Sequence, residues 1–257
     1  MANATSSNAT GPTPDSELPD SEPSDSTLSG SKVPGGAAVQ PRALIVDWGG
    51  VLTSPLAAAL DDWFAAEGIT AGDFAAAMRD FRIEGLNTLN AFDPVRALER
   101  GEMAVHSFEQ ALAAGIARHS GAAVSAEGLI NRMFAGFAAA PAMVNVVRRA
   151  KAAGLRTALL SNSWGNEYLR EDWDVLFDAV VISGEVGMRK PDPDIYLYTL
   201  EQLGCRPAEA VFVDDLEANI RGAAAVGIVG VHHRSFEETL TELEALFGVD
   251  LEPTAQS

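Results

Sequence analysis

The sequence predicts an α/β fold in which a doubly wound parallel sheet carries an inserted all-helical segment. From residue 141 onwards, short apolar runs of strand length alternate with stretches in which apolar residues recur every three or four positions. Three of the helical stretches end at a glycine: Gly154, Gly204 and Gly227. One further apolar run, at 43–46, precedes a long stretch with helical periodicity only. Because strands that alternate with helices form parallel sheets, this long helical stretch is expected to be an insertion after the first strand.

The same periodicities place the individual elements. Strands are expected at 43–46, 156–160, 178–183, 210–213 and 228–231. Helices of the sheet layer are expected at 141–153, 191–203, 216–226 and 235–247. The last of these begins with Ser235 three residues before Glu238, which is the spacing of a capping box. Within the insertion, Ser107 and Ser125 precede helical patterns and are expected to be N-caps.

Composition divides the chain into three parts. Residues 1–40 are rich in Ser, Pro, Asp and Gly and contain no aromatic residue, so they are expected to form a disordered tail. This tail also lacks the apolar segment of a secretory signal. Residues 41–54 and 138–257 are expected to form the α/β core, and residues 55–137 a helical cap of about four helices.

Charge and cysteine content narrow the range of partners and compartments. The formal net charge of -18 disfavours nucleic acid and anionic membranes as partners. No apolar run approaches the length that spans a membrane. The single cysteine, Cys205, excludes an internal disulfide and is expected to be a buried thiol rather than a nucleophile. We therefore expect a cytoplasmic protein, monomeric or homodimeric, that acts on a small molecule.

Acidic residues follow two of the predicted strands at the point where each strand ends. Asp47 follows the run 43–46, and Asp214 and Asp215 follow the run 210–213. Taken alone, each is an ordinary turn or helix-capping residue. Ligands bind at the carboxyl ends of parallel strands, however, and three carboxylates that meet there repel one another unless a hard cation lies between them. The pattern therefore predicts a Mg²⁺ site.

Donor groups follow one further strand end and precede one helix. Ser161 and Asn162 come after the strand at 156–160, and Lys190 precedes a proline where a helix is expected to begin. A hydroxyl, backbone amides and one ammonium group are the donors that a dianionic phosphoryl group needs. Each of these residues is unremarkable alone, and it is their joint occurrence with the acidic residues that predicts a phosphate site.

Four sequence segments contain these residues: LIVDWGGVL with Asp47, TALLSNS with Ser161, GMRKPDPDIY with Lys190, and VFVDD with Asp214 and Asp215. In this order they resemble the four motifs of the haloacid dehalogenase superfamily, whose core is a Rossmann-like sheet and of which one subclass has a helical cap. The resemblance extends from Ala43 to about Leu251. Through SNSW, VGMRKPDPDIY and DDLEANIRGA the chain is similar to the N-terminal phosphatase domains of soluble epoxide hydrolases and to bacterial sugar-phosphate phosphatases.

The resemblance implies a Mg²⁺-dependent phosphomonoester hydrolase that acts on a small phosphorylated metabolite through an aspartyl phosphate. Asp47 would be the nucleophile, and Lys190 would neutralise both this carboxylate and the transferring phosphoryl group. Ser161, the Asn162 backbone and Lys190 would bind the phosphoryl oxygens. The metal ligands would be Asp47, the Gly49 backbone carbonyl, Asp214 and Asp215.

One position departs from the family pattern. Phosphatases of this superfamily usually carry a second aspartate two residues after the nucleophile, which protonates the leaving group, and this chain has Gly49 there. Loss of a general acid costs about two to four powers of ten in rate if nothing replaces it. A non-catalytic or weakly active protein that binds phosphate compounds is therefore the alternative.

Two further reactions of the superfamily fit the sequence less well. Haloacid dehalogenases need no metal, and the acidic pair Asp214 and Asp215 argues against that chemistry. Phosphonoacetaldehyde hydrolases use a cap lysine, whereas the lysines here are Lys32, Lys151 and Lys190, all outside the expected cap. The four histidines are expected to have surface or structural roles: His106, His119, His232 and His233.

Overall fold

The computed structural model describes residues 39–87, 93–168 and 170–252. In these residues, five strands form one parallel sheet in the order β3-β2-β1-β4-β5. The strands are β1 (Ala43–Val46), β2 (Arg156–Ser161), β3 (Ala179–Ile182), β4 (Ala210–Asp214) and β5 (Val229–His232). The predicted doubly wound parallel sheet is thus confirmed. The expected disordered tail lies almost wholly outside the described residues.

Helices connect the strands and cover the sheet. They are α6 (Pro141–Ala152), α7 (Trp173–Leu176), α8 (Ser183–Val186), α9 (Pro193–Leu203), α10 (Glu217–Ala225) and α11 (Phe236–Phe247), with a 3-10 turn at Pro207–Glu209. The capping serine of α11 is confirmed, because the Ser235 side chain accepts a hydrogen bond from the Glu238 amide. Within the described residues, no helix is both long enough and apolar enough to cross a membrane.

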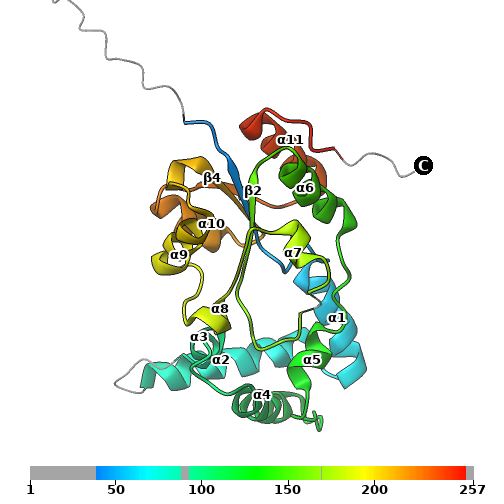
Figure 1. The fold of residues 1–257 in the computed structure, drawn as a ribbon. Helices are drawn as coiled ribbons and strands as arrows, with labels where there is room; N and C mark the ends of the chain where they lie inside the picture. Colours follow the sequence, from blue (N-terminus) through cyan, green and yellow to red (C-terminus); the bar gives the residue numbers. More distant parts are fainter. Residues whose placement is uncertain (1–38, 88–92, 169, 253–257) are drawn as a thin grey trace, which may run out of the picture. The chain divides into compact units, whose positions relative to one another are not determined.

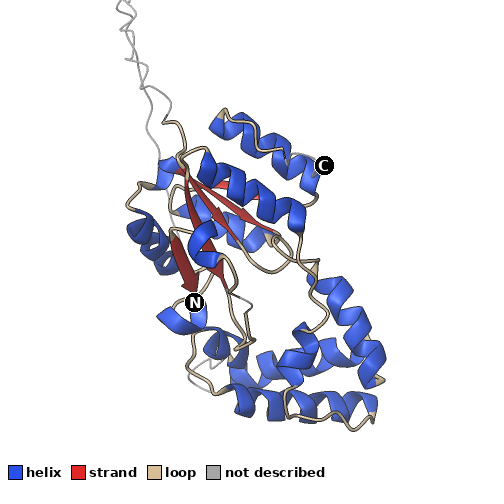
Figure 2. Cartoon of the chain, turned by 45° about the vertical axis from the view of Figure 1, so that its right-hand side comes forward, coloured by secondary structure: helices blue, strands red, loops and turns tan. Residues whose placement is uncertain are grey.

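The sheet is buried on both faces, which explains why its strands are continuous apolar runs. Alternate side chains of β1 enter two different clusters. Leu44 and Val46 pack in one cluster with residues of α6, α7 and α11. Ala43 and Ile45 pack in the other cluster with residues of α9 and α10. Figures 1 and 2 show the corresponding arrangement, with the strands lying between two layers of helices.

The register of the central strand brings polar residues together at one edge. β1 pairs with β2 and β4, and Val46 lies opposite Leu159 and Val213. The Asp47 amide then donates to the Val213 carbonyl at 2.9 Å. Asp47 and Asp214, the next residues along these two strands, therefore lie side by side at the carboxyl end of the sheet.

A helical segment lies between β1 and β2, as predicted. Its helices, which we call the inserted helices, are α1 (Leu56–Glu67), α2 (Ala71–Asn87), α3 (Pro94–Glu99), α4 (Val105–Ser120) and α5 (Leu129–Phe134). They pack around a third cluster that includes Trp63, Phe108 and Leu112. Five helices are described here, against about four expected. The division into a core and a cap at residues 54–55 and 137–138 stays a prediction.

The chain leaves the sheet layer and returns to it at neighbouring points. Thr53 and Ala139 form an antiparallel bridge. Beside it, the Ser54 amide donates to the Ala138 carbonyl at 2.7 Å, and the Ala140 amide donates to the Leu52 carbonyl at 2.8 Å. The two linking segments are thus held together by backbone hydrogen bonds.

The two N-caps expected in the insertion are wrong. α4 begins at Val105, so Ser107 lies inside its first turn, and no side chain caps this helix. α5 begins at Leu129 after Gly128 in a left-handed conformation, which leaves Ser125 in the preceding loop. Burial of Phe108, 0% exposed, anchors α4 more firmly than a local cap would, since packing supplies most of the stability of a short helix.

Candidate active site

Three carboxylates meet at the carboxyl end of β1 and β4. Asp47 follows β1 directly, Asp214 is the last residue of β4, and Asp215 comes next. Asp47 is 7% exposed and Asp214 is 0% exposed. One oxygen from each of the three side chains lies within 4.8 Å of the others. The acidic residues selected from the sequence are therefore brought together, in a place where their mutual repulsion needs a cation.

Lys190 is the cation that the chain itself provides. Its Nζ atom lies 2.8 Å from Asp47 Oδ1 and 2.7 Å from Asp214 Oδ2, and it donates to the Leu160 carbonyl at 3.0 Å. The Lys190 residue is only 1% exposed. All three positive hydrogen atoms of the ammonium group thus have an acceptor, which is the condition for burying such a charge.

Asn162 holds the backbone of Lys190 in place. The Asn162 Nδ2 atom donates to the Lys190 carbonyl at 3.0 Å, and the Lys190 amide donates to Asn162 Oδ1 at 2.9 Å. These two bonds link the loop after β2 to the loop before α9. Both polar atoms of the Asn162 side chain thus hold the Lys190 backbone.

The pKa values of the site residues show that its negative charge exceeds its positive charge. Burial raises the pKa of Asp47 to about 7, Lys190 opposes this shift, and Asp214 adds to it. Burial and the neighbouring Asp214 also raise the pKa of Asp215. Burial alone would lower the pKa of Lys190, but the carboxylates of Asp214 and Asp47 raise it above the ordinary value. Lys190 therefore stays charged, yet it does not suffice to keep every carboxylate readily ionised.

Asp214 and Asp215 differ in their surroundings. Asp214 accepts hydrogen bonds from Lys190, from Asn219 Nδ2 at 3.0 Å and from the Leu216 amide at 2.8 Å. Asp215, in contrast, lies against Gly50, where a Cβ atom would come within 2.4 Å of Asp215 Oδ2. The donor set offers only hard oxygen atoms, and it therefore fits a Mg²⁺ ion. Of the three carboxylates, Asp47 and Asp215 accept fewer hydrogen bonds than Asp214 does.

The loop after β2 contributes residues that the sequence did not single out. Ser161 Oγ lies 3.0 Å from the hydroxyl of Tyr168, and Ser161 is 2% exposed. Burial raises the pKa of Tyr168, so its hydroxyl stays protonated at neutral pH. Asn166 is 7% exposed, and its Nδ2 atom has no hydrogen-bond partner among the described residues. The segment SNSWGNEY, which is rich in polar residues, was the available sequence signal for Tyr168 and Asn166.

A cavity of about 230 Å³ opens beside Asp47 and Lys190. Ser161, Asn162, Asn166, Tyr168 and Asp215 line its polar end, and residues of the inserted helices line the other end. Gly49 also borders it, and a Cβ atom there would have nothing within 4 Å. Of the two adjacent glycines, Gly50 has the positive φ, 73°. Gly49 is therefore a site where a side chain could be accommodated.

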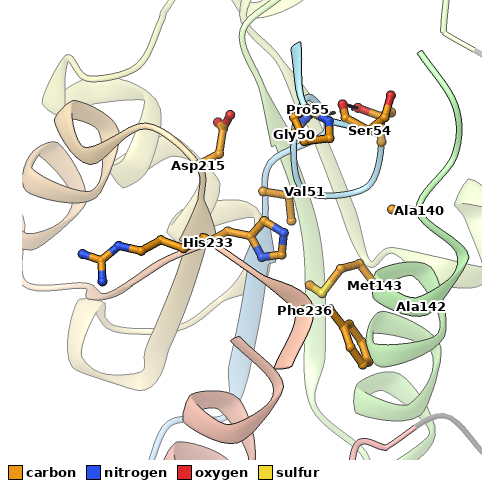
Figure 3. Close-up of a pocket in the computed structure, with 12 residues that line it drawn as sticks. Gly50, Val51, Ser54, Pro55, Ala140, Ala142, Met143, Asp215, His233 and Phe236 are labelled. Atoms are coloured by element: carbon orange, nitrogen blue, oxygen red, sulfur yellow. Dashed lines mark hydrogen bonds between the residues drawn. The ribbon is translucent and has the colours of Figure 1, made fainter. Parts of the chain in front are cut away.

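A second cavity, of about 380 Å³, lies on another side of Asp215. Gly50, Met143 and His233 are among its lining residues. Figure 3 shows the His233 ring directed towards Val51 and Met143, away from the Asp215 carboxylate. His233 Nδ1 lies 2.8 Å from Thr239 Oγ1, which ties this ring to α11.

The other histidines and the cysteine lie outside the carboxylate cluster. His232 Nε2 lies 2.9 Å from the Asp215 carbonyl oxygen, and so it contacts the backbone of the site rather than a side chain. His119 lies 2.9 Å from Asp80, and His106 is exposed. Cys205 is only partly buried, where a buried thiol was expected; this partial burial raises the pKa of the thiol, which makes it a poor nucleophile.

Two curated proteins with similar sequences each match 41% of this chain. A sesquiterpene phosphatase from Aspergillus oryzae is 38% identical over 111 residues, which is 41% of this chain and 56% of that protein. Bifunctional epoxide hydrolase 2 from Rattus norvegicus is 32% identical over 116 residues, which is 41% of this chain and 21% of that protein. The match therefore spans little more than half of the first relative and about a fifth of the second.

Solved structures extend the likeness over most of the described fold. A HAD family enzyme from Bacteroides thetaiotaomicron, solved in complex with magnesium and inorganic phosphate, is 20% identical with a TM-score of 0.52. The alignment covers 76% of this chain and 94% of that chain. The family model for haloacid dehalogenase-like hydrolases matches residues 41–227, which include the carboxylates, Lys190 and the inserted helices. This chain therefore belongs to the haloacid dehalogenase-like hydrolase family.

Proposed function

We propose that this protein is a Mg²⁺-dependent phosphomonoester hydrolase that acts on a small phosphorylated metabolite through an aspartyl phosphate. The observation that carries the proposal is the position of Lys190, buried between Asp47 and Asp214 beside the acidic cluster. Such an arrangement keeps a carboxylate nucleophile in place next to a fixed positive charge. The phosphatase name of the Aspergillus relative and the magnesium and phosphate in the Bacteroides enzyme support it.

In this proposal, Asp47, Gly49, Asp214 and Asp215 hold the metal, with Asp47, the Gly49 carbonyl and Asp215 as direct ligands and Asp214 bound directly or through water. When bound, Mg²⁺ would supply positive charge for the phosphoryl oxygens and lower the repulsion among the carboxylates. Lys190 would donate to a phosphoryl oxygen while it remains paired with Asp214. The Ser161 hydroxyl and the Asn162 amide would bind the remaining phosphoryl oxygens.

The reaction would have two steps. In the first, a carboxylate oxygen of Asp47 attacks phosphorus and the bond to the ester oxygen breaks as the aspartyl phosphate forms; the leaving oxygen departs as an alkoxide, which takes a proton from water on release to give the alcohol. In the second, water attacks the phosphorus of this intermediate, which releases inorganic phosphate and regenerates the Asp47 carboxylate. The inserted helices, as the proposed cap, would exclude bulk water during the first step.

Gly49 is the observation that favours the alternative function. Without a carboxylic acid at this position, the leaving oxygen departs with less proton assistance, and turnover slows. A protein with an intact phosphate and metal site but slow chemistry would act as a binder of phosphorylated compounds. Binding without turnover is therefore the second candidate.

The test is hydrolysis of acetyl phosphate and 4-nitrophenyl phosphate in the presence and absence of MgCl₂. We expect turnover that needs Mg²⁺, stops on addition of EDTA and is lost in Asp47→Asn. Asp61→Asn, an exposed position on α1, is the matched control and should retain full activity. Mass spectrometry of the quenched wild-type enzyme should show a phosphoryl group on the peptide that contains Asp47. Equal turnover in Asp47→Asn would contradict the assigned nucleophile, and binding of phosphate without any turnover would favour the alternative.

A further inference from the structure

The end of the active-site cavity away from the phosphoryl site is built mainly from hydrocarbon. Its aromatic lining residues are Trp48, Phe74, Phe134, Phe137 and Trp164, and the Tyr168 ring adjoins Trp48 from the polar end. Several of them contact one another: the ring centroids of Phe134 and Phe137 are 5.2 Å apart, and those of Phe137 and Trp48 are 5.3 Å apart. A continuous aromatic wall thus runs from helix α5 to the residue that follows Asp47.

Charged groups are scarce along this wall. In the part of the chain that the structure describes, Glu99 is the one charged lining residue outside the phosphoryl and metal site. Glu99 is 7% exposed, forms an ion pair with Arg189 and accepts from the Trp164 indole at 3.2 Å. Its carboxylate is therefore already neutralised and hydrogen-bonded. A sugar or polyol bound here would bury hydroxyl groups with few partners, which is costly.

The mouth of the cavity carries two leucines that the fold leaves in contact with water. Leu56, at the start of α1, is 43% exposed, and Leu216, before α10, is 56% exposed. Both line the cavity. Each lies on a different side of the site, one on the inserted helices and one on the sheet layer. Both side chains therefore offer apolar surface to a group that extends out of the cavity.

We infer that the phosphate ester hydrolysed by this protein carries a hydrocarbon group, long enough to fill the aromatic wall and reach Leu56 and Leu216. This inference rests on the proposed function, because it identifies the leaving-group side of the same site. It replaces the general class of small phosphorylated metabolites by apolar phosphate monoesters. The hydrocarbon group gains affinity from burial, whereas the phosphoryl group is held by Lys190 and the metal site.

The experiment measures binding, so that it does not depend on turnover. A series of n-alkylphosphonates from methyl to octyl is titrated into the wild-type protein with MgCl₂ by isothermal titration calorimetry. We expect the affinity to rise by about threefold to fourfold for each methylene group that enters the cavity. Propylphosphonate should bind more tightly than 2,3-dihydroxypropylphosphonate, which has the same carbon chain with two added hydroxyl groups.

Two matched variants test whether the gain in affinity with chain length arises at the mouth of the cavity. Leu216→Ser should leave methylphosphonate binding unchanged and reduce the gain for the longest chains. Leu197→Ser is the control, because Leu197 on α9 is also an exposed leucine, 48%, but is not a lining residue of the cavity. Its binding series should match that of the wild type.

The outcomes separate this inference from the proposed function. Affinity that is independent of chain length, or tighter binding of the dihydroxy compound, would overturn the inference even if acetyl phosphate is hydrolysed. Chain-length-dependent binding in a protein that hydrolyses no phosphate ester would support the apolar site and contradict the proposed catalysis. An equal loss of affinity in Leu216→Ser and Leu197→Ser would also contradict the proposed path across the mouth.

Discussion

The ammonium group of Lys190 lies 2.8 Å from the carboxylate of Asp47, and Lys190 is 1% exposed. Replacing one partner of a buried ion pair leaves the other charge without compensation. Lys190→Met should therefore lower the free energy of unfolding by about 3–5 kcal/mol and abolish turnover. Urea unfolding at neutral pH in EDTA measures the first effect without a contribution from metal binding.

Lys151→Met is the matched control for this change. Lys151 lies 3.2 Å from Asp178, but the two side chains are 29% and 37% exposed. Solvent screens such a pair, so the loss should stay below about 1 kcal/mol. Similar losses in both variants would show that Lys190 is no more important to the fold than a surface lysine.

Asp214 and Asp215 should respond differently to loss of charge. Asp215→Asn removes a proposed direct ligand, so Mg²⁺ should no longer raise the thermal midpoint, whereas the metal-free protein should remain stable because burial already disfavours this charge. Asp214→Asn weakens the buried contact with Lys190 and should lower the metal-free stability by about 3 kcal/mol. Thermal unfolding with and without MgCl₂ measures both effects. An undiminished Mg²⁺ response in Asp215→Asn would contradict its role as a ligand.

Gly49→Asp should restore proton donation to the leaving group. A Cβ atom at Gly49 has nothing within 4 Å, so the variant should fold with a stability change of less than about 1 kcal/mol. Its kcat/KM for alkyl phosphates should rise by up to about two to four powers of ten, and that for aryl phosphates much less. The measurement is kcat/KM for esters graded by leaving-group pKa. If the wild-type rate does not depend on leaving-group pKa, another residue already supplies the proton.

Gly50→Ala provides the steric control for the same loop. At Gly50 the φ angle is 73° and an added Cβ atom would lie 2.4 Å from Asp215 Oδ2. This small change should therefore destabilise the protein and weaken Mg²⁺ binding, although alanine adds less bulk than the aspartate at the neighbouring position. Normal Mg²⁺ binding in Gly50→Ala would show that the loop adjusts freely.

The pH dependence of stability can be tested at Glu209, away from the site. Its carboxylate accepts hydrogen bonds from the Arg206 side chain at 2.9 Å and the Arg206 amide at 2.8 Å, which lower its pKa from 4.5 to about 2. The pKa of Glu209 is lower in the folded protein than in the unfolded chain. The ionised carboxylate therefore stabilises the fold fully above pH 4.5, and this stabilisation is lost as the pH falls towards 2. The stability difference between wild type and Glu209→Gln should shrink over that range. In an Arg206→Ala background the effect of Glu209→Gln on stability should depend much less on pH. If the stability difference between wild type and Glu209→Gln instead grows towards low pH, the pKa of Glu209 is not lowered by folding.

Much of the site follows from the sequence because it depends on strand ends. Asp47 and Asp214 become neighbours as soon as β1 and β4 pair in parallel, and the apolar runs that predict this pairing are continuous in the sequence. The position of Lys190 was less determined by local pattern, since its side chain reaches the carboxylates from the loop before α9. The sequence places Lys190 in the site only through its joint occurrence with the acidic residues, and the structure supplies the distances.

The residues that the sequence did not identify depend on packing between distant segments. Tyr168 contacts Ser161 only because of the path of a loop, and Asn219 reaches Asp214 from the first turn of α10. The aromatic wall joins Phe134 to Trp48 across the insertion, and no short-range pattern encodes that contact. The N-caps expected at Ser107 and Ser125 failed for a related reason, because burial sets where those helices begin.

The backbone pairing of Thr53 with Ala139 has a consequence for how such a protein changes over generations. Since the two ends of the insertion meet, a segment of different length or sequence can be exchanged between them by recombination without altering the register of β1. Leu56 and Phe134, which border the cavity, would travel with that segment, whereas Asp47, Lys190 and Asp215 would stay behind. The part of the cavity wall that lies on the insertion can thus vary without a change in Asp47, Lys190 or Asp215, whereas Trp48 and Leu216 stay with the sheet layer.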